Sequence, residues 1–267
     1  MPRITLLTDF GTRDGYVAAM KGVVASITPG TIIDDASHDI APGDVAAGAR
    51  ALGRYWRRYP TGTVHVAVVD PGVGTARRAI AAEADRRLFV VPDNGLLSRV
   101  LDEAKRVRLV EIREPRYILP GASRTFHGRD VFAPAAAYLA GGIHLGRLGP
   151  TVEDPIRIPE PEVTEEDGAV IGEVVSLDRF GNLVTNLSAG SLDDAEGVEI
   201  DGRPIPVVRT YGEMPEREVG AIVNSDGRLE VAARDTSAAD VLDVGVGTPV
   251  RIRRREGRGA DPGLAPA

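Results

Sequence analysis

The sequence predicts an α/β protein: an N-terminal, mostly parallel sheet covered by helices, followed by a small C-terminal all-β barrel. Two observations support this class. Strand-like and helix-like stretches alternate as far as Pro150, a pattern typical of parallel strands joined by crossover helices. Beyond that point the strand-like stretches are short, punctuated by glycine and almost without helical periodicity, which favours a barrel.

The elements of the first part follow from local composition. Runs of β-branched and aliphatic residues that end at glycine, proline or aspartate predict strands, and alanine-rich stretches predict helices. We expect Asp14 to cap the first helix. Strands are expected at residues 3–10, 30–37, 63–69, 78–85, 87–94 and 107–112, and helices at about 16–27, 43–59, 95–104 and 129–142.

The second part begins after a change in amino-acid composition. The stretch "PTVEDPIRIPEPEVTEEDG" combines four prolines with an acidic excess, which is typical of a linker or surface crossing. Strands are expected at 168–178, 181–187, 197–211, 220–233 and 248–255. We therefore predict an α/β domain at 1–155, a linker at 156–167, a barrel domain at 168–256 and a disordered tail at 257–267.

Composition excludes several classes of protein. The net charge of -7 disfavours a sequence-independent nucleic-acid binder, which needs a basic surface. The absence of cysteine excludes disulfides, zinc-thiolate sites and thiol catalysis. No apolar run approaches the roughly 20 residues of a membrane helix, and the first residues lack the layout of a signal peptide. We therefore expect a cytoplasmic protein that binds neither nucleic acid nor membrane.

The stretch "VVDPGVGTARR" places a carboxylate at the end of a strand. Asp70 is followed by a Pro-Gly-x-Gly turn, with Arg77 seven residues further on. A dinucleotide loop needs a third glycine, and a P-loop needs Gly-Lys-Ser/Thr, so neither phosphate motif is present. The turn can instead fold Arg77 toward Asp70.

Asp9, in "TDFGTRDGY", stands at the end of the first strand. A carboxylate there can accept hydrogen bonds from both hydroxyls of a ribose, as in dinucleotide-binding folds. Two other roles stay open at this point: a helix cap, and a metal ligand as in a metal-dependent nucleotidase. The four histidines show no spacing typical of metal ligands, which weighs against metal.

Three further stretches carry candidate residues. His127 lies in the glycine-marked loop "TFHGRD" beside Phe126, which could cover a base or sugar. In "SLDRFGN", Asp178, Phe180 and Asn182 lie in a turn between two strands. On local grounds a plain hairpin is the favoured explanation of that turn, although an asparagine can pair with an adenine edge and a phenylalanine can stack on its ring. Ser225 lies in a similar hairpin, "NSDG".

Together, the motifs "TDFGTRDGY", "VVDPGVGT-x-R", "PDNGLL", "TFHGRD", "D-x-FGN" and "NSDG-x-LE-x-A" resemble the S-adenosylmethionine hydrolase (adenosine-forming) family. This family is related to the enzymes that fluorinate or chlorinate the same substrate. The resemblance runs from about residue 3 to 253. It implies a homotrimer whose substrate lies between the N-terminal domain of one subunit and the C-terminal domain of its neighbour.

The resemblance also implies roles for single residues. Asp70, Arg77 and His127 correspond to a catalytic triad that positions and activates a water. Asp9 corresponds to the residue that binds the ribose hydroxyls and Asn182 to the adenine contact. Phe180 and Tyr211 correspond to aromatic neighbours of the nucleoside, and Asp178 and Ser225 to contacts with the methionine end. Asp226 replaces the arginine that the halogenases carry next to that serine.

The sequence therefore predicts hydrolysis of S-adenosylmethionine to adenosine and L-methionine, with no cofactor and no metal. The alternatives are halogenase-like substitution and a non-catalytic adenosine or S-adenosylmethionine binder. The halogenases lack an aspartate at the position of Asp70, the fluorinating ones have Tyr-Ser where this chain has His127-Gly128, and they carry a long insertion between the hairpin strands. A carboxylate would also repel a halide in a site of low dielectric.

Overall fold

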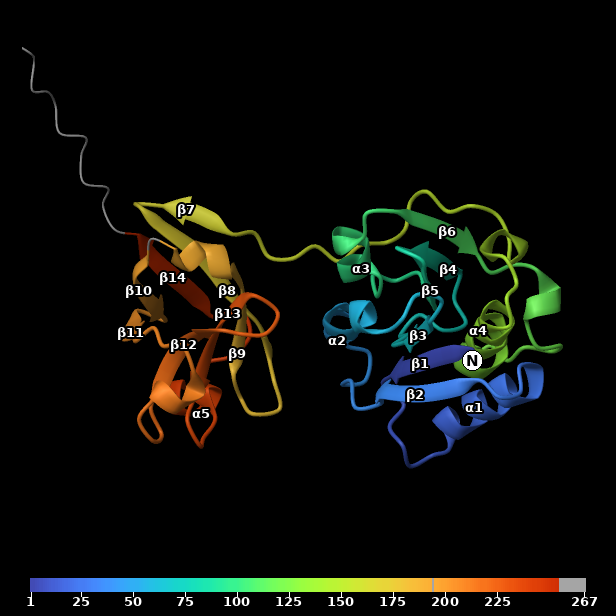
Figure 1. Ribbon diagram of the computed structural model, residues 1–267, viewed down its shortest axis with the longest axis horizontal. Helices are drawn as coiled ribbons and strands as arrows, with labels where there is room; N and C mark the ends of the chain where they lie inside the picture. The colour runs from blue at the N-terminus through green and yellow to red at the C-terminus, as the bar shows by residue number, and fades with distance from the viewer. Residues whose placement is uncertain (194, 255–267) are drawn as a thin grey trace, which may run out of the picture. The chain divides into compact units, whose positions relative to one another are not determined.

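The computed structural model describes residues 1–193 and 195–254 (Figure 1). The chain forms two compact units, Met1–Pro159 and Glu160–Ala267. The tail expected at 257–267 lies outside the described residues. Among the residues that are described, no helix combines the length and apolar character needed to cross a lipid bilayer.

A six-stranded sheet forms the centre of the first unit. β4 is antiparallel to both of its neighbours, whereas the other adjacent pairs are parallel, so the expected mostly parallel sheet is confirmed. The strand order is β2 (Ile32–Ser37), β1 (Arg3–Thr8), β3 (Val64–Val68), β5 (Arg87–Pro92), β4 (Ala79–Ala84), β6 (Val107–Glu111).

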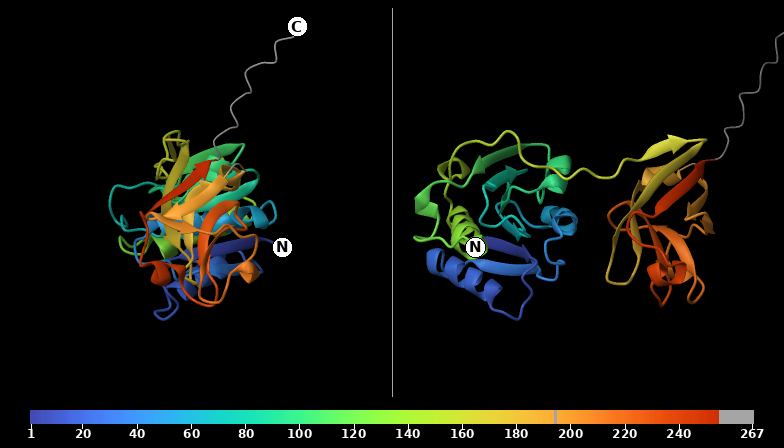
Figure 2. Two further views of the ribbon diagram at one scale, coloured as in Figure 1. Left: turned by 90° about the vertical axis from the view of Figure 1, so that its left-hand side faces the viewer. Right: turned by 180° about the vertical axis from the view of Figure 1, so that it is seen from behind.

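Helices cover both faces of this sheet. α1 (Tyr16–Ile27) and α4 (Ala133–Ala140) share one apolar core with β1 and β3, and they lie side by side in both Figure 1 and the reverse view of Figure 2. α2 (Val45–Tyr55) and α3 (Ser98–Glu103) pack in the other core. Because helices shield both faces, the side chains at the ends of the strands are the ones that remain available to form a site.

The expected helix boundaries need three corrections. Asp14 does not cap α1: the residue before the helix is Gly15, in a left-handed conformation with no side-chain cap. α2 begins later than residue 43 because Asp44 caps it, accepting a hydrogen bond from the Ala47 N–H at 2.8 Å. α3 begins three residues later than the expected 95–104, at Ser98, since the chain turns at Gly95 with a φ of 101°.

The second unit is an eight-stranded, largely antiparallel sheet that nearly closes on itself. A bridge between Val207 and Ala221 joins the region after β11 to the edge strand β12, which confirms the expected barrel. α5 (Ala238–Leu242) packs against its core. The strand order is β11 (Arg203–Ile205), β10 (Ala195–Ile200), β14 (Pro249–Arg254), β8 (Ala169–Leu177), β9 (Leu183–Ser188), β13 (Arg228–Ala233), β12 (Val219–Val223).

The stretch expected as a linker, 156–167, contains local structure. Ile156 N–H donates to Asp93 of the first unit at 2.8 Å, and β7 (Thr164–Glu166) pairs with β8. The strand forms because Asp167 and Gly168 both have positive φ, 49° and 72°, the geometry of a tight two-residue hairpin turn.

Candidate functional site

Neighbouring parallel strands bring two candidate carboxylates to one edge of the first sheet. β1 and β3 are paired in register up to Thr8 and Val68, so Asp9 and Asp70 both follow the carboxyl ends of these strands. This edge is where open α/β sheets bind their ligands. The sequence alone placed both residues at strand ends, and the pairing brings those ends together.

Asp70 and Arg77 form a buried ion pair. The Arg77 Nε donates to Asp70 Oδ1 at 2.9 Å and Oδ2 at 3.1 Å, and Nη2 also donates to Oδ2. The side chain of Arg77 is 9% exposed and that of Asp70 is 5% exposed. A guanidinium that donates through two nitrogens fixes the plane of the carboxylate. The structure therefore brings these two predicted residues together and fixes the orientation of Asp70.

The turn between them is tightly packed. Val73 N–H donates to Asp70 O at 3.2 Å, and Thr75 N–H donates to Gly72 O at 3.2 Å. Gly74 has a φ of 79°, and a Cβ there would lie 2.4 Å from the carbonyl oxygen of Arg124. Only glycine fits this position, so the glycine of the quoted motif is needed to return Arg77 to Asp70.

His127 completes the cluster from a distant part of the chain. It directly precedes a π-helical turn, Gly128–Phe132, and its Nδ1 lies 2.9 Å from Arg77 Nη2. Because a guanidinium can only donate, Nδ1 is the acceptor, and the proton of the neutral ring is on Nε2. Burial and then the Arg77 charge lower the pKa of His127, with Asp70 and Asp130 opposing this shift.

A cavity of about 370 Å³ opens onto Asp70 and His127. Three aromatic rings line it, with centroids 5.8 Å apart for Phe10 and Phe126 and 5.1 Å apart for Tyr16 and Phe126. The remaining wall is formed by Val68, Val73, Ser123, Thr125, Gly128 and Arg129. An apolar pocket with a few convergent polar groups is typical of a small-molecule site, and Phe126 lies where the sequence predicted an aromatic wall.

Asp9 lies beside this cavity but is not among its lining residues. Its Oδ2 accepts a hydrogen bond from the Gly43 N–H at 2.8 Å. This bond holds the carboxylate against the segment that leads into α2. Of the roles left open for Asp9, the structure does not show a cap on α1, since Gly15 occupies that position without a side-chain bond.

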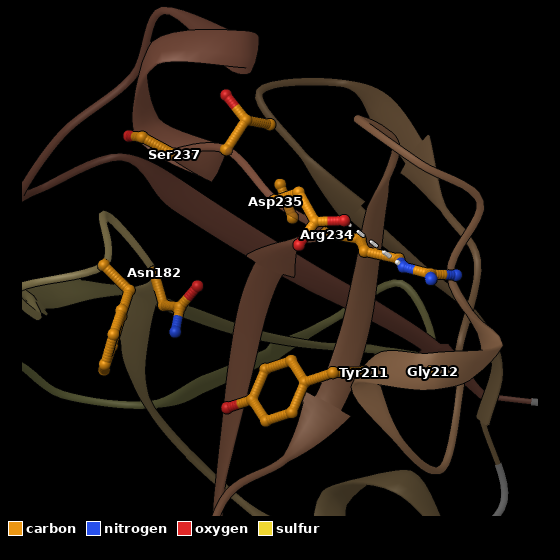
Figure 3. A pocket seen from close by; sticks show the side chains of 9 residues that line it. Asn182, Tyr211, Gly212, Arg234, Asp235 and Ser237 are labelled. Atoms are coloured by element: carbon orange, nitrogen blue, oxygen red, sulfur yellow. Dashed lines mark ion pairs between the residues drawn. The ribbon is translucent and has the colours of Figure 1, made fainter.

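The second unit has its own pocket of about 730 Å³ (Figure 3). Phe180, Asn182 and Tyr211 line it, and Phe180 and Tyr211 are 76% and 48% exposed. Large rings this exposed are unusual on a water-facing surface and common where a ligand or partner binds. Gly212, Ala233, Arg234, Asp235, Thr236 and Ser237 complete the wall, with Arg234 and Asp235 forming the ion pair drawn in Figure 3.

Asp178 braces the turn that carries two of these residues. Its Oδ1 accepts from the backbone N–H groups of Phe180 at 2.8 Å and Asn182 at 2.9 Å, and its Oδ2 accepts from Asn182 Nδ2 at 3.0 Å. Asp178 therefore stabilises the turn, and it is not among the residues that line the pocket; its expected contact with the methionine end stays a prediction. The same bonds hold the Asn182 amide in one orientation.

Ser225 is exposed in the β12–β13 turn and does not line the pocket. Its neighbour Asn224 holds that turn, accepting from the backbone N–H groups of Asp226 and Arg228. Sequence reasoning missed a further residue, Glu230, which is 4% exposed in β13. A glutamate inside an apolar strand was the available signal.

Metal binding receives no support from the arrangement of side chains. Within residues 1–193 and 195–254, no group of three or more histidine, aspartate or glutamate side chains is placed to hold a metal ion. The site residues are instead paired with arginine and backbone N–H groups.

Comparison with known proteins gives matches along almost the whole chain. The models of the SAM hydroxide adenosyltransferase N-terminal and C-terminal domains match residues 4–149 and 172–251. A protein of Thermus thermophilus named (R)-S-adenosyl-L-methionine hydrolase is 44% identical over 94% of this chain and 100% of its own length. A protein of the same name from Salinispora tropica is 42% identical over 94% and 97%.

More distant relatives and solved structures also match this chain along almost its whole length. A fluorinase of an Actinoplanes species is 29% identical over 95% of this chain and 98% of its own. That alignment spans 291 positions, more than the 267 residues here, so the fluorinase has segments that this chain lacks. The crystal structure of an uncharacterized conserved protein from Thermotoga maritima superposes with a TM-score of 0.87 at 34% identity, covering 94% and 100% of the two chains.

Proposed function

The chain belongs to the SAM hydroxide adenosyltransferase family, and on this premise we propose that it hydrolyses S-adenosyl-L-methionine to adenosine and L-methionine. The observation that carries the proposal for the site is the Asp70–Arg77–His127 cluster, which opens onto an aromatic-lined cavity. Incubation of the protein with S-adenosylmethionine and chromatography for adenosine tests it.

The reaction suits a site of this composition. Water forms a bond to the ribose C5′ while the bond from C5′ to sulfur breaks, and the electron pair of that bond neutralises the sulfonium to give methionine. A neutral leaving group needs no acid and no metal. The protein needs only to hold the water in line and remove its proton. Activity unchanged by EDTA supports the metal-free proposal, and loss restored by one divalent ion contradicts it.

Within this proposal, the proton of the water goes to Asp70. Arg77 donates to His127 Nδ1 at 2.9 Å, so the available ring nitrogen, Nε2, carries a proton and acts as a donor. Asp70 has acceptor capacity on both oxygens beyond the bonds from Arg77. His127 then orients the water by donating to its oxygen, and Asp70 accepts the proton as the C5′–oxygen bond forms.

Asp9 is proposed to bind the ribose hydroxyls, since it lies at the strand edge beside the cavity. Asp9→Ala should weaken substrate binding as well as turnover, because a ribose contact acts in both the ground and the transition state. An Asp9→Ala enzyme with unchanged affinity would contradict this role.

The names of two relatives refine the substrate. Both are called (R)-S-adenosyl-L-methionine hydrolase, and we propose the same sulfonium epimer for this chain. Racemised substrate should be consumed only in part, leaving the (S) epimer, as chiral chromatography of the residue will show. Complete consumption of both epimers at equal rates contradicts the preference.

We also propose a cytoplasmic homotrimer with a site shared between subunits. The Asp70–Arg77–His127 cluster lies in the first unit, and the pocket with Asn182 and Tyr211 lies in the second. Co-expression of Asp70→Asn with Asn182→Ala should restore activity, because mixed trimers rebuild an intact site from two damaged subunits. Absence of any restored activity in mixed trimers argues for a site within one subunit.

Two alternatives are tested by the same incubation. A halogenase would form halogenated adenosine in the presence of chloride or fluoride, but the Asp70 carboxylate on the cavity disfavours a halide there. A non-catalytic binder would leave S-adenosylmethionine intact.

A further inference from the structure

The second unit buries a carboxylate that none of the proposed roles uses. Glu230 is 4% exposed in β13, and a buried charged side chain needs partners. The Tyr211 hydroxyl donates to its Oε1 at 2.8 Å, and Asn224 Nδ2 donates to its Oε2 at 3.1 Å. Glu230 therefore links the β12–β13 turn to a tyrosine of the pocket.

The orientation of the Asn224 amide is fixed independently. Its Oδ1 accepts hydrogen bonds from the backbone N–H groups of Asp226 at 3.0 Å and Arg228 at 3.1 Å. Flipping the amide would place its NH₂ group against two backbone donors. Nδ2 must therefore face Glu230, and Glu230 Oε2 must be an acceptor.

The bond from Tyr211 fixes the polarity of its hydroxyl. A tyrosine hydroxyl has one proton and two lone pairs, whereas an ionised carboxylate can only accept. The proton is therefore committed to Glu230, which leaves lone pairs for any other partner. Burial, followed by the bond and charge of Glu230, raises the pKa of Tyr211 to about 12, so the hydroxyl keeps its proton at neutral pH.

Tyr211 lies where this polarity can act on a ligand. The residue lines the pocket together with Phe180 and Asn182, and Figure 3 shows Tyr211 and Asn182 reaching it from different elements. We propose that Glu230 is a positioning residue that determines specificity: it holds the Tyr211 hydroxyl as a hydrogen-bond acceptor for an N–H or O–H group of the bound nucleoside. This inference rests on the proposed function, because the nucleoside is the adenosine part of the substrate.

Glu230→Gln tests the polarity with little change of shape. The glutamine Oε1 would accept from Asn224, and its NH₂ would donate to Tyr211, whose own proton would then point away from residue 230. The hydroxyl would become a donor, and a substrate donor would face another donor. We expect adenosine to bind about 10-fold more weakly to the full-length variant in calorimetry. Glu196→Gln, an exposed position on β10, is the matched control and should bind as the wild type does.

A double-mutant cycle separates this effect from general damage. If Glu230 acts through the hydroxyl, Tyr211→Phe should weaken adenosine binding, and adding Glu230→Gln should cost nothing further. An undiminished affinity in Glu230→Gln, or an equal further loss in the Tyr211→Phe background, overturns the proposal. If Glu230→Gln does not fold, Tyr211→Phe decides, and unchanged adenosine binding overturns it.

Purine riboside, which lacks the 6-amino group, locates the donor. If Glu230→Gln weakens the binding of adenosine alone, the 6-amino group is the donor to Tyr211. If it weakens the binding of both nucleosides equally, a ribose hydroxyl is the donor. Both outcomes support the proposal. Wild-type protein that binds adenosine but releases none from S-adenosylmethionine refutes the proposed function and leaves this inference standing. Wild-type protein that does not bind adenosine overturns it.

Discussion

Asp70→Asn is the most informative single change in the first unit. The two residues are nearly identical in shape, so the cavity keeps its form. Both Asp70 oxygens accept from Arg77, so in either orientation of the asparagine amide its NH₂ group would face the guanidinium. The substitution removes the proposed proton acceptor and leaves Arg77, 9% exposed, as a buried charge without its anion.

Two magnitudes follow from this geometry. Loss of a general base lowers turnover by about 100- to 10,000-fold. Breaking a buried ion pair by removing one partner costs about 3–5 kcal/mol, and in a chain of this size this lowers the thermal midpoint by roughly 6–20 °C. Substrate affinity should change little, because the proposed adenine and ribose contacts are other residues.

The double variant Asp70→Asn/Arg77→Met separates the two effects. Methionine removes the unpaired charge and keeps an apolar side chain against Phe132, over which the Arg77 guanidinium lies at 5.3 Å. Thermal stability should largely return while turnover stays low. Adenosine release measures the rate, calorimetry the affinity and thermal melting the stability. A single variant with wild-type turnover refutes the mechanism, and a double variant as unstable as the single one refutes the reasoning about the buried charge.

Three further expectations concern single glycines and histidines. Gly74→Ala should lower the free energy of unfolding by about 2 kcal/mol or more and reduce turnover, since its Cβ would lie 2.4 Å from a backbone oxygen. Gly62→Ala, at a φ of 86° with open space around it, should lower the free energy of unfolding by only about 1 kcal/mol. Urea unfolding measures both. Burial, aided by a nearby arginine, lowers the pKa of His65 from 6.5 to about 3. At pH 5 the unfolded chain therefore binds a proton at His65 that the folded chain does not bind, and the free energy of unfolding should fall by about 2 kcal/mol between pH 7 and 5. His65→Gln should reduce this pH dependence of stability, and an unchanged pH dependence contradicts the assignment. Because the pKa of His127 is lowered, the acid limb of the rate profile should lie below pH 6.5, and Arg77→Met should move it upward; a limb that does not move argues against a neutral His127.

Part of the site was predictable because its geometry is local. Asp70 and Arg77 are seven residues apart across a Pro-Gly turn, and a single turn can fold one side chain toward the other. The strand ends at Asp9 and Asp70 follow from β-branched runs that stop at an acidic residue. Motif resemblance then supplied the family, which the domain matches over residues 4–149 and 172–251 confirm.

Local reasoning failed where two explanations fitted the same residues. Asp14 and Gly15 both precede α1, and the left-handed φ of 75° at Gly15 leaves no place for an aspartate cap. Asp178 suited either a ligand or a turn; only the structure shows the three hydrogen bonds that it accepts within the turn, and its contact with a ligand stays a prediction. Glu230 was missed because both faces of β13 are buried, so alternation gave no sign of which way it points.

The sequence by itself determined the fold class, the element order and the Asp70–Arg77 turn, because hydrophobic periodicity and turn chemistry act over a few residues. Only the tertiary structure decided which distant groups meet. His127 reaches Arg77 across 50 residues, and Tyr211 reaches Glu230 across 19. These bonds fix which nitrogen of His127 accepts and which way the Tyr211 proton points. A hydrogen bond forms only when its donor–acceptor distance is right to within a few tenths of an ångström. Tertiary packing sets that distance, and no pattern along the chain encodes it.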